Sequence, residues 1–359
     1  MLDLARLQRL KLTRRPLSQR FFGRLLGLNY GYLPGVSVEF ENVERIPDRP
    51  VIYAMNHTDR YNYFPFQYKL WKLRDRFTAA WVKGKYYENR LLAAFMENMA
   101  QLPTVSRGYL ITRDFLAVMG RTPTDREYAL LREAVDACAL GDDYQLPVPP
   151  EVPEQLLRKP RNPLGIAFEP GPEWEEGPET SVAATSDSGA GGGADSSGRT
   201  DYAQYICALF RAMMARFTEL NEEAIETGLD LLIFPQGTRS KRLLPGRVGI
   251  GQIALRLKIP IVPVGCNGSD FVYPSGSPVG KKGRIVYRIG QPIEEAELSA
   301  FHVAASYEPF TAAAERDHAA AFQKVSDLVT DRIDELLDPE YQRAADAGHD
   351  AARGAQRFV

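Results

Sequence analysis

Residues 229–240 of the chain read LDLLIFPQGTRS, so a short apolar run passes directly into a polar turn with proline and glycine. The same change occurs at residues 51–57, VIYAMNH, and a third apolar run, IPIVPV, covers residues 259–264. Short continuous apolar runs are typical of strands in a parallel sheet that is covered on both faces. Because such sheets usually place their sites at the carboxyl ends of strands, both polar turns are candidate sites.

Further runs predict the elements around these strands. Residues 36–40 alternate apolar and polar side chains, and residues 284–289, RIVYRI, predict a late strand. Helical patterns cover residues 89–99, 125–139, 202–227, 250–257 and 312–337. Strands that alternate with helices predict an α/β fold with a mainly parallel central sheet flanked by helices.

The composition of the 359 residues is that of an ordinary globular protein, with 44% hydrophobic and 25% charged side chains. The 44 basic residues are balanced by 46 acidic ones. A dedicated nucleic-acid-binding protein would carry a basic excess, so no nucleic-acid partner is expected.

The three cysteines, Cys138, Cys207 and Cys266, are far apart in the sequence and include no CxxC pair. Neither a disulfide scaffold nor a zinc ribbon is therefore predicted, no metal site is expected, and a reducing compartment fits. No apolar stretch approaches the roughly 18 residues of a membrane-spanning helix. Arg20 and Arg24 interrupt any signal-peptide core, so a cytoplasmic location is expected.

Residues 1–30 carry seven basic side chains and one acidic one, interleaved with leucine and phenylalanine. Such a basic amphipathic segment suits the surface of an anionic membrane, with its apolar side in the interface. Alternatively, it is a leading helix that packs Leu7 and Leu10 on the domain and leaves its arginines in solvent. The membrane interpretation is preferred because of the motifs described below, and it predicts peripheral membrane association.

The segment from Gly141 to Arg199 has an unusual composition. It holds nine of the 25 prolines, a Gly/Ser tract, and eleven acidic against four basic residues. Such a segment buries too little apolar surface to offset the entropy of ordering it. We therefore predict a disordered insertion at residues 141–200, within one domain at 31–340 that is followed by a tail at 341–359.

Two turns carry the candidate chemistry. His57 follows an apolar strand, and histidine is the side chain best suited to general-base work near neutral pH. A single histidine, however, is more often structural. In the second turn, Gly237 lets backbone N–H groups approach a ligand, and Arg239 offers a planar fork for a phosphate or carboxylate. An ordinary strand-to-turn transition would contain the same residues.

Taken together and in order, these segments resemble the glycerolipid acyltransferase superfamily, typified by lysophosphatidate acyltransferases. The family's first motif is NH followed by four residues and Asp, and its third is usually FPEGTRS. The second ends in a substrate-binding arginine, and the fourth is a proline-rich apolar strand. The similar segments here are NHTDRYN at 56–62, LPTVSRG at 102–108, FPQGTRS at 234–240 and IPIVPV at 259–264. The resemblance covers about residues 36–300 apart from the insertion.

The resemblance implies a single α/β acyltransferase domain and an enzyme of phospholipid biosynthesis. It implies that His57 takes a proton from a hydroxyl of a lysophospholipid or glycerol-phosphate-like acceptor. That hydroxyl then attacks the thioester of an acyl-CoA or acyl carrier protein, which is a co-substrate, and no cofactor is implied. The residues that the resemblance assigns to substrate binding are Arg107, Gln236, Gly237, Thr238 and Arg239.

Two positions depart from the family pattern. Asn62 stands where the family has aspartate, and an amide oxygen can orient the imidazole but cannot stabilise the imidazolium by charge. Asp59 either supplies the missing carboxylate as a third catalytic candidate or caps the following helix. Gln236 replaces the glutamate of the third motif. The alternative interpretation is therefore a catalytically weak or inactive lipid-binding relative, and a third possibility is acyl transfer to an acceptor without phosphate.

Overall fold

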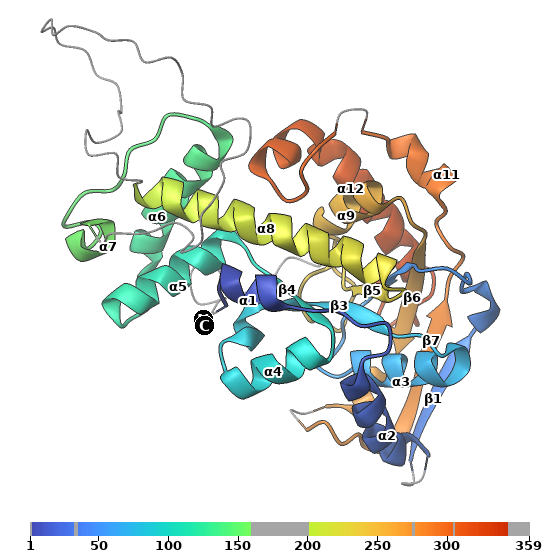
Figure 1. The fold of residues 1–359 in the computed structure, drawn as a ribbon. Helices are drawn as coiled ribbons and strands as arrows, with labels where there is room; N and C mark the ends of the chain where they lie inside the picture. The colour runs from blue at the N-terminus through green and yellow to red at the C-terminus, as the bar shows by residue number, and fades with distance from the viewer. Residues whose placement is uncertain (1, 32–34, 159–200, 275–276, 304–305, 344–359) are drawn as a thin grey trace, which may run out of the picture. The chain divides into compact units, whose positions relative to one another are not determined.

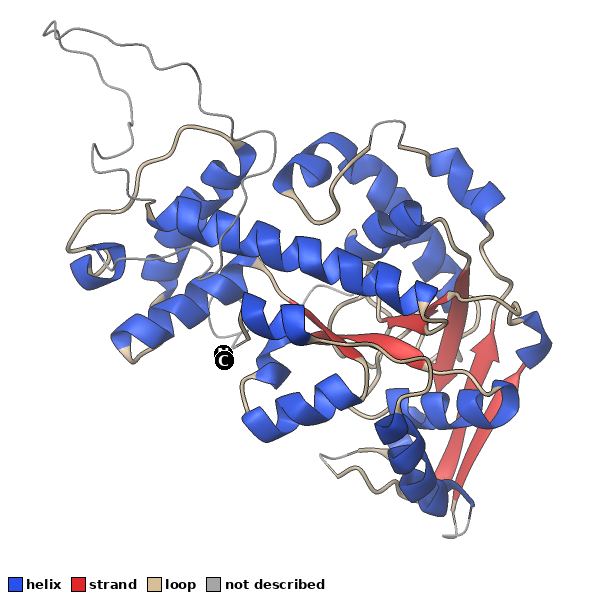
Figure 2. Cartoon of the chain, viewed as in Figure 1, coloured by secondary structure: helices blue, strands red, loops and turns tan. Residues whose placement is uncertain are grey.

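The apolar runs form a seven-stranded sheet in the computed structural model (Figures 1 and 2). The structure describes residues 2–31, 35–158, 201–274, 277–303 and 306–343. These residues form two compact units. The first takes its described residues from Met1–Val105 and Met213–Ala352, and the second from Ser106–Ala212.

The first unit contains the sheet, whose strand order is β1-β7-β6-β2-β5-β3-β4. Neighbouring strands are parallel except β6 and β7, which are antiparallel, so the predicted mainly parallel sheet is confirmed. The strands are β1 (Val36–Glu41), β2 (Ile52–Met55), β3 (Thr78–Lys83), β4 (Gln101–Thr104), β5 (Asp230–Ile233), β6 (Ile261–Asn267) and β7 (Gly283–Ile289).

Helices flank this sheet in the first unit, and the second unit is helical in its described part. The helices of the first unit are α1 (Leu4–Arg9), α2 (Leu17–Gly31), α3 (Tyr63–Arg74), α4 (Arg90–Asn98), α9 (Gly249–Leu257), α10 (Ser269–Val272), α11 (Glu295–Leu298) and α12 (Ala312–Asp334). The second unit contains α5 (Arg107–Met119), α6 (Asp125–Leu140) and α7 (Glu154–Arg158). Helix α8 (Tyr202–Glu226) begins in the second unit and ends in the first.

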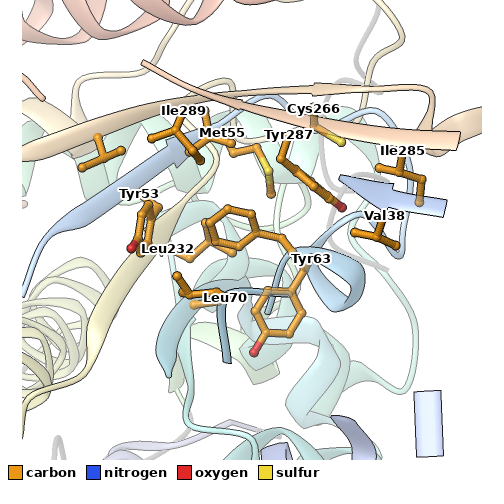
Figure 3. Close-up of a cluster of buried hydrophobic side chains, with 14 of the residues drawn as sticks. Val38, Tyr53, Met55, Tyr63, Leu70, Leu232, Cys266, Ile285, Tyr287 and Ile289 are labelled. Carbon is orange, nitrogen blue, oxygen red and sulfur yellow. The ribbon is translucent and has the colours of Figure 1, made fainter. Parts of the chain in front are cut away.

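Strand β2 shows why its apolar run is continuous. Tyr53 and Met55 join a buried cluster with Leu70 of α3 and Tyr287 of β7, as Figure 3 shows. The opposite face of β2 is covered by α12, which also contacts β6. Because alternate residues of a strand face opposite sides of the sheet and both sides are covered here, consecutive residues of β2 must all be apolar.

Helices α9 and α12 approach each other at a glycine. A Cβ atom at Gly251 would lie 2.3 Å from the carbonyl oxygen of Phe322, so no larger residue fits there without moving the backbone. Gly251 therefore has a packing role, which is the usual explanation for a small residue at a helix contact.

The strands predicted near β1, β2, β5, β6 and β7 are confirmed, as are the helices corresponding to α4, α6, α8, α9 and α12. Strand β3 and helix α3 were not predicted from periodicity. Strand β3 begins with Thr78-Ala79-Ala80, and its two alanines give a weak strand signal. Helix α3 has aromatic and basic residues on all sides, so its sequence lacks an apolar period.

The basic segment at residues 1–30 divides into two parts. Helix α1 packs inward, because Leu2, Leu4, Leu7 and Leu10 are all buried. Helix α2 instead presents a row of leucine and phenylalanine side chains to solvent. No described helix is both long and apolar enough to span a bilayer. Membrane association stays a prediction, and its candidate surface is α2 rather than α1.

The second unit includes the start of the predicted insertion. Helix α7 lies at residues 154–158, and the side chains of Val152 and Leu156 are fully buried. The end of this stretch, residues 152–158, therefore packs in the second unit, whereas most side chains of residues 141–151 are exposed. Residues 159–200, and the tail from 344 onward, lie outside the described residues, so the insertion as a whole stays a prediction.

Candidate active site

The two polar turns meet at one edge of the sheet. Strands β2 and β5 are parallel neighbours, so both turns leave from carboxyl ends. The backbone N–H of Ser240 donates to the carbonyl oxygen of His57 at 2.9 Å. The N–H of His57 points to the Oε1 atom of Gln236 at 3.5 Å. The first and third motifs, which are about 180 residues apart in sequence, are thus joined by one backbone hydrogen bond and one contact between a backbone N–H and a side chain.

The imidazole of His57 is held by Asn62. The Nδ1 atom of His57 lies 3.1 Å from the Oδ1 atom of Asn62. The amide group of Asn62 is oriented by its Nδ2 atom, which donates to the carbonyl oxygen of Asn56 at 2.9 Å. Because Oδ1 can only accept, Nδ1 of His57 carries the proton, and Nε2 keeps its lone pair. This is the tautomer that a general base requires.

Asn62 stands at the N-cap of α3, but its side chain makes no capping hydrogen bond. It is fully buried, and it serves the imidazole instead. The neighbouring Asn56 is fixed in turn, since its side chain exchanges two hydrogen bonds with the backbone of Cys266 at 2.7 and 2.9 Å. The orientation of His57 therefore depends on a chain of buried amides that reaches from β2 to β6.

The environment of His57 favours its neutral form. The ring stacks on Phe234, with centroids 4.1 Å apart and planes inclined by 23°. Burial lowers the pKa of His57 to about 4, the positive charges of Arg239 and Lys83 act in the same direction, and the hydrogen bond to Asn62 opposes them. At neutral pH the imidazole is therefore unprotonated and able to accept a proton.

The carboxylate of Asp59 forms hydrogen bonds with its neighbours in sequence and not with His57. Its carboxylate accepts hydrogen bonds from the backbone N–H of Tyr61 at 2.7 Å and from the hydroxyl of Thr58 at 3.0 Å. Burial raises the pKa of Asp59. Its hydrogen bonds to described residues include none to the imidazole, so of the two competing orienting residues the geometry favours Asn62. The catalytic roles of His57, Asn62 and Asp59 stay predictions.

The turn of the third motif is closed by its own hydrogen bonds. Gly237 has a φ of 65°, in the left-handed region that favours glycine, and its N–H donates to the carbonyl oxygen of Phe234 at 3.0 Å. The Nε2 atom of Gln236 donates to the carbonyl oxygen of Thr238 at 2.9 Å. A glutamate could not make this donation unless it were protonated, so Gln236 suits the turn as a neutral residue. Because the N–H of Gly237 already donates to Phe234, it is not a free donor for the oxyanion that forms during acyl transfer.

A pocket of about 440 Å³ opens beside His57 within the first unit. Both apolar and basic side chains line it. Its apolar side chains include Phe64, Trp81, Leu92, Phe95, Met96, Met99 and Phe234, and its basic ones are Arg60, Lys83, Lys85 and Arg239. Thr238 and Gly237 also line it, whereas Gln236 lies buried behind the turn. Among the described residues, no three His, Cys, Asp or Glu side chains are grouped as metal ligands.

Lys83 and Lys85 line the pocket but were not predicted as site residues from the sequence, although their position after an apolar segment could have indicated them. Lys83 is the last residue of strand β3 and Lys85 follows it, and the carboxyl end of β3 lies at the same sheet edge as those of β2 and β5. Once Thr78–Lys83 is identified as a strand, the rule that sites follow carboxyl ends points to them.

Arg107 belongs to the second unit. Its guanidinium forms an ion pair with Asp136 at 2.8 Å and lies over the ring of Phe210 at 5.3 Å. The side chain is mostly buried. Its predicted role in substrate binding stays a prediction.

Comparisons with known proteins agree with the motifs. A family model named Acyltransferase matches residues 209–267. A 1-acyl-sn-glycerol-3-phosphate acyltransferase from Cocos nucifera is 34% identical over 85 residues. That match covers 23% of this chain and 28% of the curated relative, so the chain spans less than a third of the relative's length.

A solved structure is also similar, the 1-acyl-sn-glycerophosphate (LPA) acyltransferase PlsC from Thermotoga maritima. The match covers 86% of this chain and 78% of that one, with a TM-score of 0.36 and 14% identity. Functional assignment therefore depends on the sequence matches and the ordered motifs. The family model and the curated relative support a similarity of this chain to the glycerolipid acyltransferase superfamily.

Proposed function

We propose that this protein transfers an acyl group from a CoA or acyl carrier protein thioester to a hydroxyl of a lysophospholipid or glycerol-phosphate-like acceptor. The observation that supports this most is the hydrogen bond between Nδ1 of His57 and Oδ1 of Asn62. It leaves Nε2 as a proton acceptor on a residue that lines a pocket with both basic and apolar side chains.

The reaction follows from that geometry. As the acceptor hydroxyl attacks the thioester carbonyl carbon, its proton passes to Nε2 of His57. The Asn62 oxygen holds the Nδ1–H of the imidazolium that forms, although without the charge that an aspartate would add. When the carbon–sulfur bond breaks, the imidazolium returns the proton to the thiolate leaving group. His57 is then neutral again, and no acyl-enzyme forms.

The pocket suits both substrates. The cationic side chains of Arg60, Lys83, Lys85 and Arg239 favour a phosphate on the acceptor or on CoA. The apolar side chains of α4 that line the same pocket suit an acyl chain, whose burial is favourable in proportion to its area. An acceptor without phosphate would use the apolar side chains alone.

Enzyme assays test this proposal. Purified protein is given acyl-CoA or acyl carrier protein donors with a panel of phosphorylated and non-phosphorylated lyso-lipids, and thiol release is measured. His57→Ala should lower the rate by about 10²–10⁴-fold, which is the usual contribution of a general base. His302→Ala removes an exposed histidine outside the pocket and should leave the rate unchanged.

Two outcomes would contradict the proposal. Wild-type protein that releases no thiol with any acceptor, yet binds lyso-lipid, would favour the lipid-binding alternative. Thiol release at the wild-type rate in His57→Ala would show that His57 is not the general base. Release only with acceptors that lack phosphate would keep acyl transfer and reassign the basic side chains to the donor.

We further propose that the protein binds its lipid substrate at the surface of an anionic membrane, and that α2 is the helix that contacts this surface. Leu17, Phe21, Leu25 and Leu28 are 76, 63, 52 and 49% exposed and recur at helical spacing. Arg20 and Arg24 lie between them and can interact with anionic headgroups.

Vesicle sedimentation tests the membrane surface. Replacing both Phe21 and Leu25 with Glu should weaken binding to phosphatidylglycerol-containing vesicles at least tenfold, because each buried side chain contributes about 1.5–3 kcal/mol. Leu140→Glu, at a half-exposed position in the second unit, is the matched control. Deletion of the whole segment is a poorer test, since α1 belongs to the core. Equal sedimentation of the wild type and the double variant would exclude α2 as the membrane surface.

A further inference from the structure

Two of the three cysteines are brought together in the second unit. Cys138 lies in the last turn of α6, and Cys207 lies in the second turn of α8. Both are free thiols with partly exposed side chains. They stand on either side of the segment at residues 141–200, so no local sequence pattern pairs them.

Hydrogen bonds fix their proximity. The Sγ atom of Cys207 donates to the carbonyl oxygen of Val135 at 3.2 Å. In a helix that carbonyl points toward the residues three and four positions later, so Cys207 lies against Cys138. The two thiols also form a hydrogen bond with each other. Nearby, the hydroxyl of Tyr144 donates to the carboxylate of Asp201 at 2.5 Å, which ties together the same two chain segments.

The two thiols differ in acidity. The hydrogen bond between the two thiols lowers the pKa of Cys138 to about 7, and the positive charge of Arg211 acts in the same direction. The same hydrogen bond, together with burial, raises the pKa of Cys207. A thiolate is the attacking species in thiol–disulfide exchange, so Cys138 is the nucleophile of the pair and Cys207 is the resolving thiol.

We propose that Cys138 and Cys207 form a redox modification site that closes reversibly into an intramolecular disulfide by exchange with small-molecule disulfides such as oxidised glutathione. This inference concerns the second unit and does not depend on the proposed acyl transfer.

The exchange has two steps. The Cys138 thiolate attacks one sulfur of oxidised glutathione, forms a mixed disulfide, and releases one glutathione thiolate. The Cys207 thiol then attacks Cys138, forms the protein disulfide, and releases the second glutathione, while its proton is taken up by the thiolates released. Two protein thiols are oxidised and one glutathione disulfide is reduced. Excess reduced glutathione reverses both steps.

Intact-mass measurement on the full chain tests the proposal. After equilibration with oxidised glutathione, the wild type should lose two hydrogens, and proteolysis should yield a peptide in which Cys138 is linked to Cys207. The Cys207→Ser variant should instead gain one glutathione at Cys138. The Cys266→Ala variant should behave like the wild type, because Cys266 is buried in the first unit.

The closed form should also unfold at a higher temperature than the reduced form, because the new bond constrains the unfolded chain between residues 138 and 207. Wild-type protein that keeps all three free thiols under oxidised glutathione would overturn the proposal. Disulfides found only between two protein molecules would overturn it too. Neither result requires a variant to fold.

Discussion

Protonation of His57 should be far less favourable in the folded protein than in the unfolded chain. Its pKa falls from an ordinary value of 6.5 to about 4, chiefly because Phe234 and the surrounding pocket desolvate the ring. One pKa unit corresponds to about 1.4 kcal/mol, so the difference amounts to about 3 kcal/mol. The Asn62 hydrogen bond offsets only part of it, because an amide oxygen has no full charge.

The titration can be followed directly by NMR on protein with labelled histidine. The chain has only four histidines, and the His57 signals are assigned by their loss in His57→Gln. We expect a midpoint near 4 for His57 in the wild type. In Asn62→Asp the midpoint should rise by about 1–3 units, because a carboxylate beside the ring favours the imidazolium. That variant should also be less stable, since its second carboxylate oxygen would face the Asn56 carbonyl, which now accepts a hydrogen bond.

The same shift predicts how stability depends on pH. Between pH 6.5 and 4 the unfolded chain binds a proton at His57 and the folded protein does not, so His57 makes the folded state less stable as the pH falls through this window. The unfolding free energy of the wild type minus that of His57→Gln should therefore drop by about 3 kcal/mol between pH 7 and pH 4. A His57 midpoint near 6.5, together with a stability difference that does not change with pH, would refute the buried neutral base.

Two further predictions concern the fold, and urea titrations of unfolding test both. Gly251→Ala should destabilise the protein by about 1–3 kcal/mol, because its Cβ would overlap the backbone of Phe322. Gly249→Ala would meet only ordinary contacts, so its unfolding free energy should stay within about 1 kcal/mol of the wild type. Arg76→Leu should cost about 3–5 kcal/mol, because it leaves the buried carboxylate of Asp230 without its ion-pair partner. Equal urea midpoints of unfolding for the two glycine variants would contradict the first prediction. An Arg76→Leu midpoint equal to that of the wild type would contradict the second.

The chemistry of the site was largely readable from local pattern. An apolar run followed by a polar turn marks the carboxyl end of a strand, and His57 and the turn at 234–240 each follow such a run. Burial on both faces of a parallel sheet is what makes those runs continuous, so the α/β class was predicted as well. The orienting residue was left open, because Asp59 and Asn62 are both close to His57 in sequence. Only the direction of their side chains distinguishes them, and it is Asn62 that contacts the ring.

By itself, then, the sequence determined the fold class, the family motifs and the candidate base, because each depends on a short run of neighbouring residues. Tertiary structure alone decided that the leucines of α1 face inward while those of α2 face solvent, since both helices have similar compositions. It also placed Lys83 beside His57 and Cys207 beside Cys138, which are contacts between residues far apart in the chain. Such pairings depend on strand order and helix packing, and no local pattern encodes either of them.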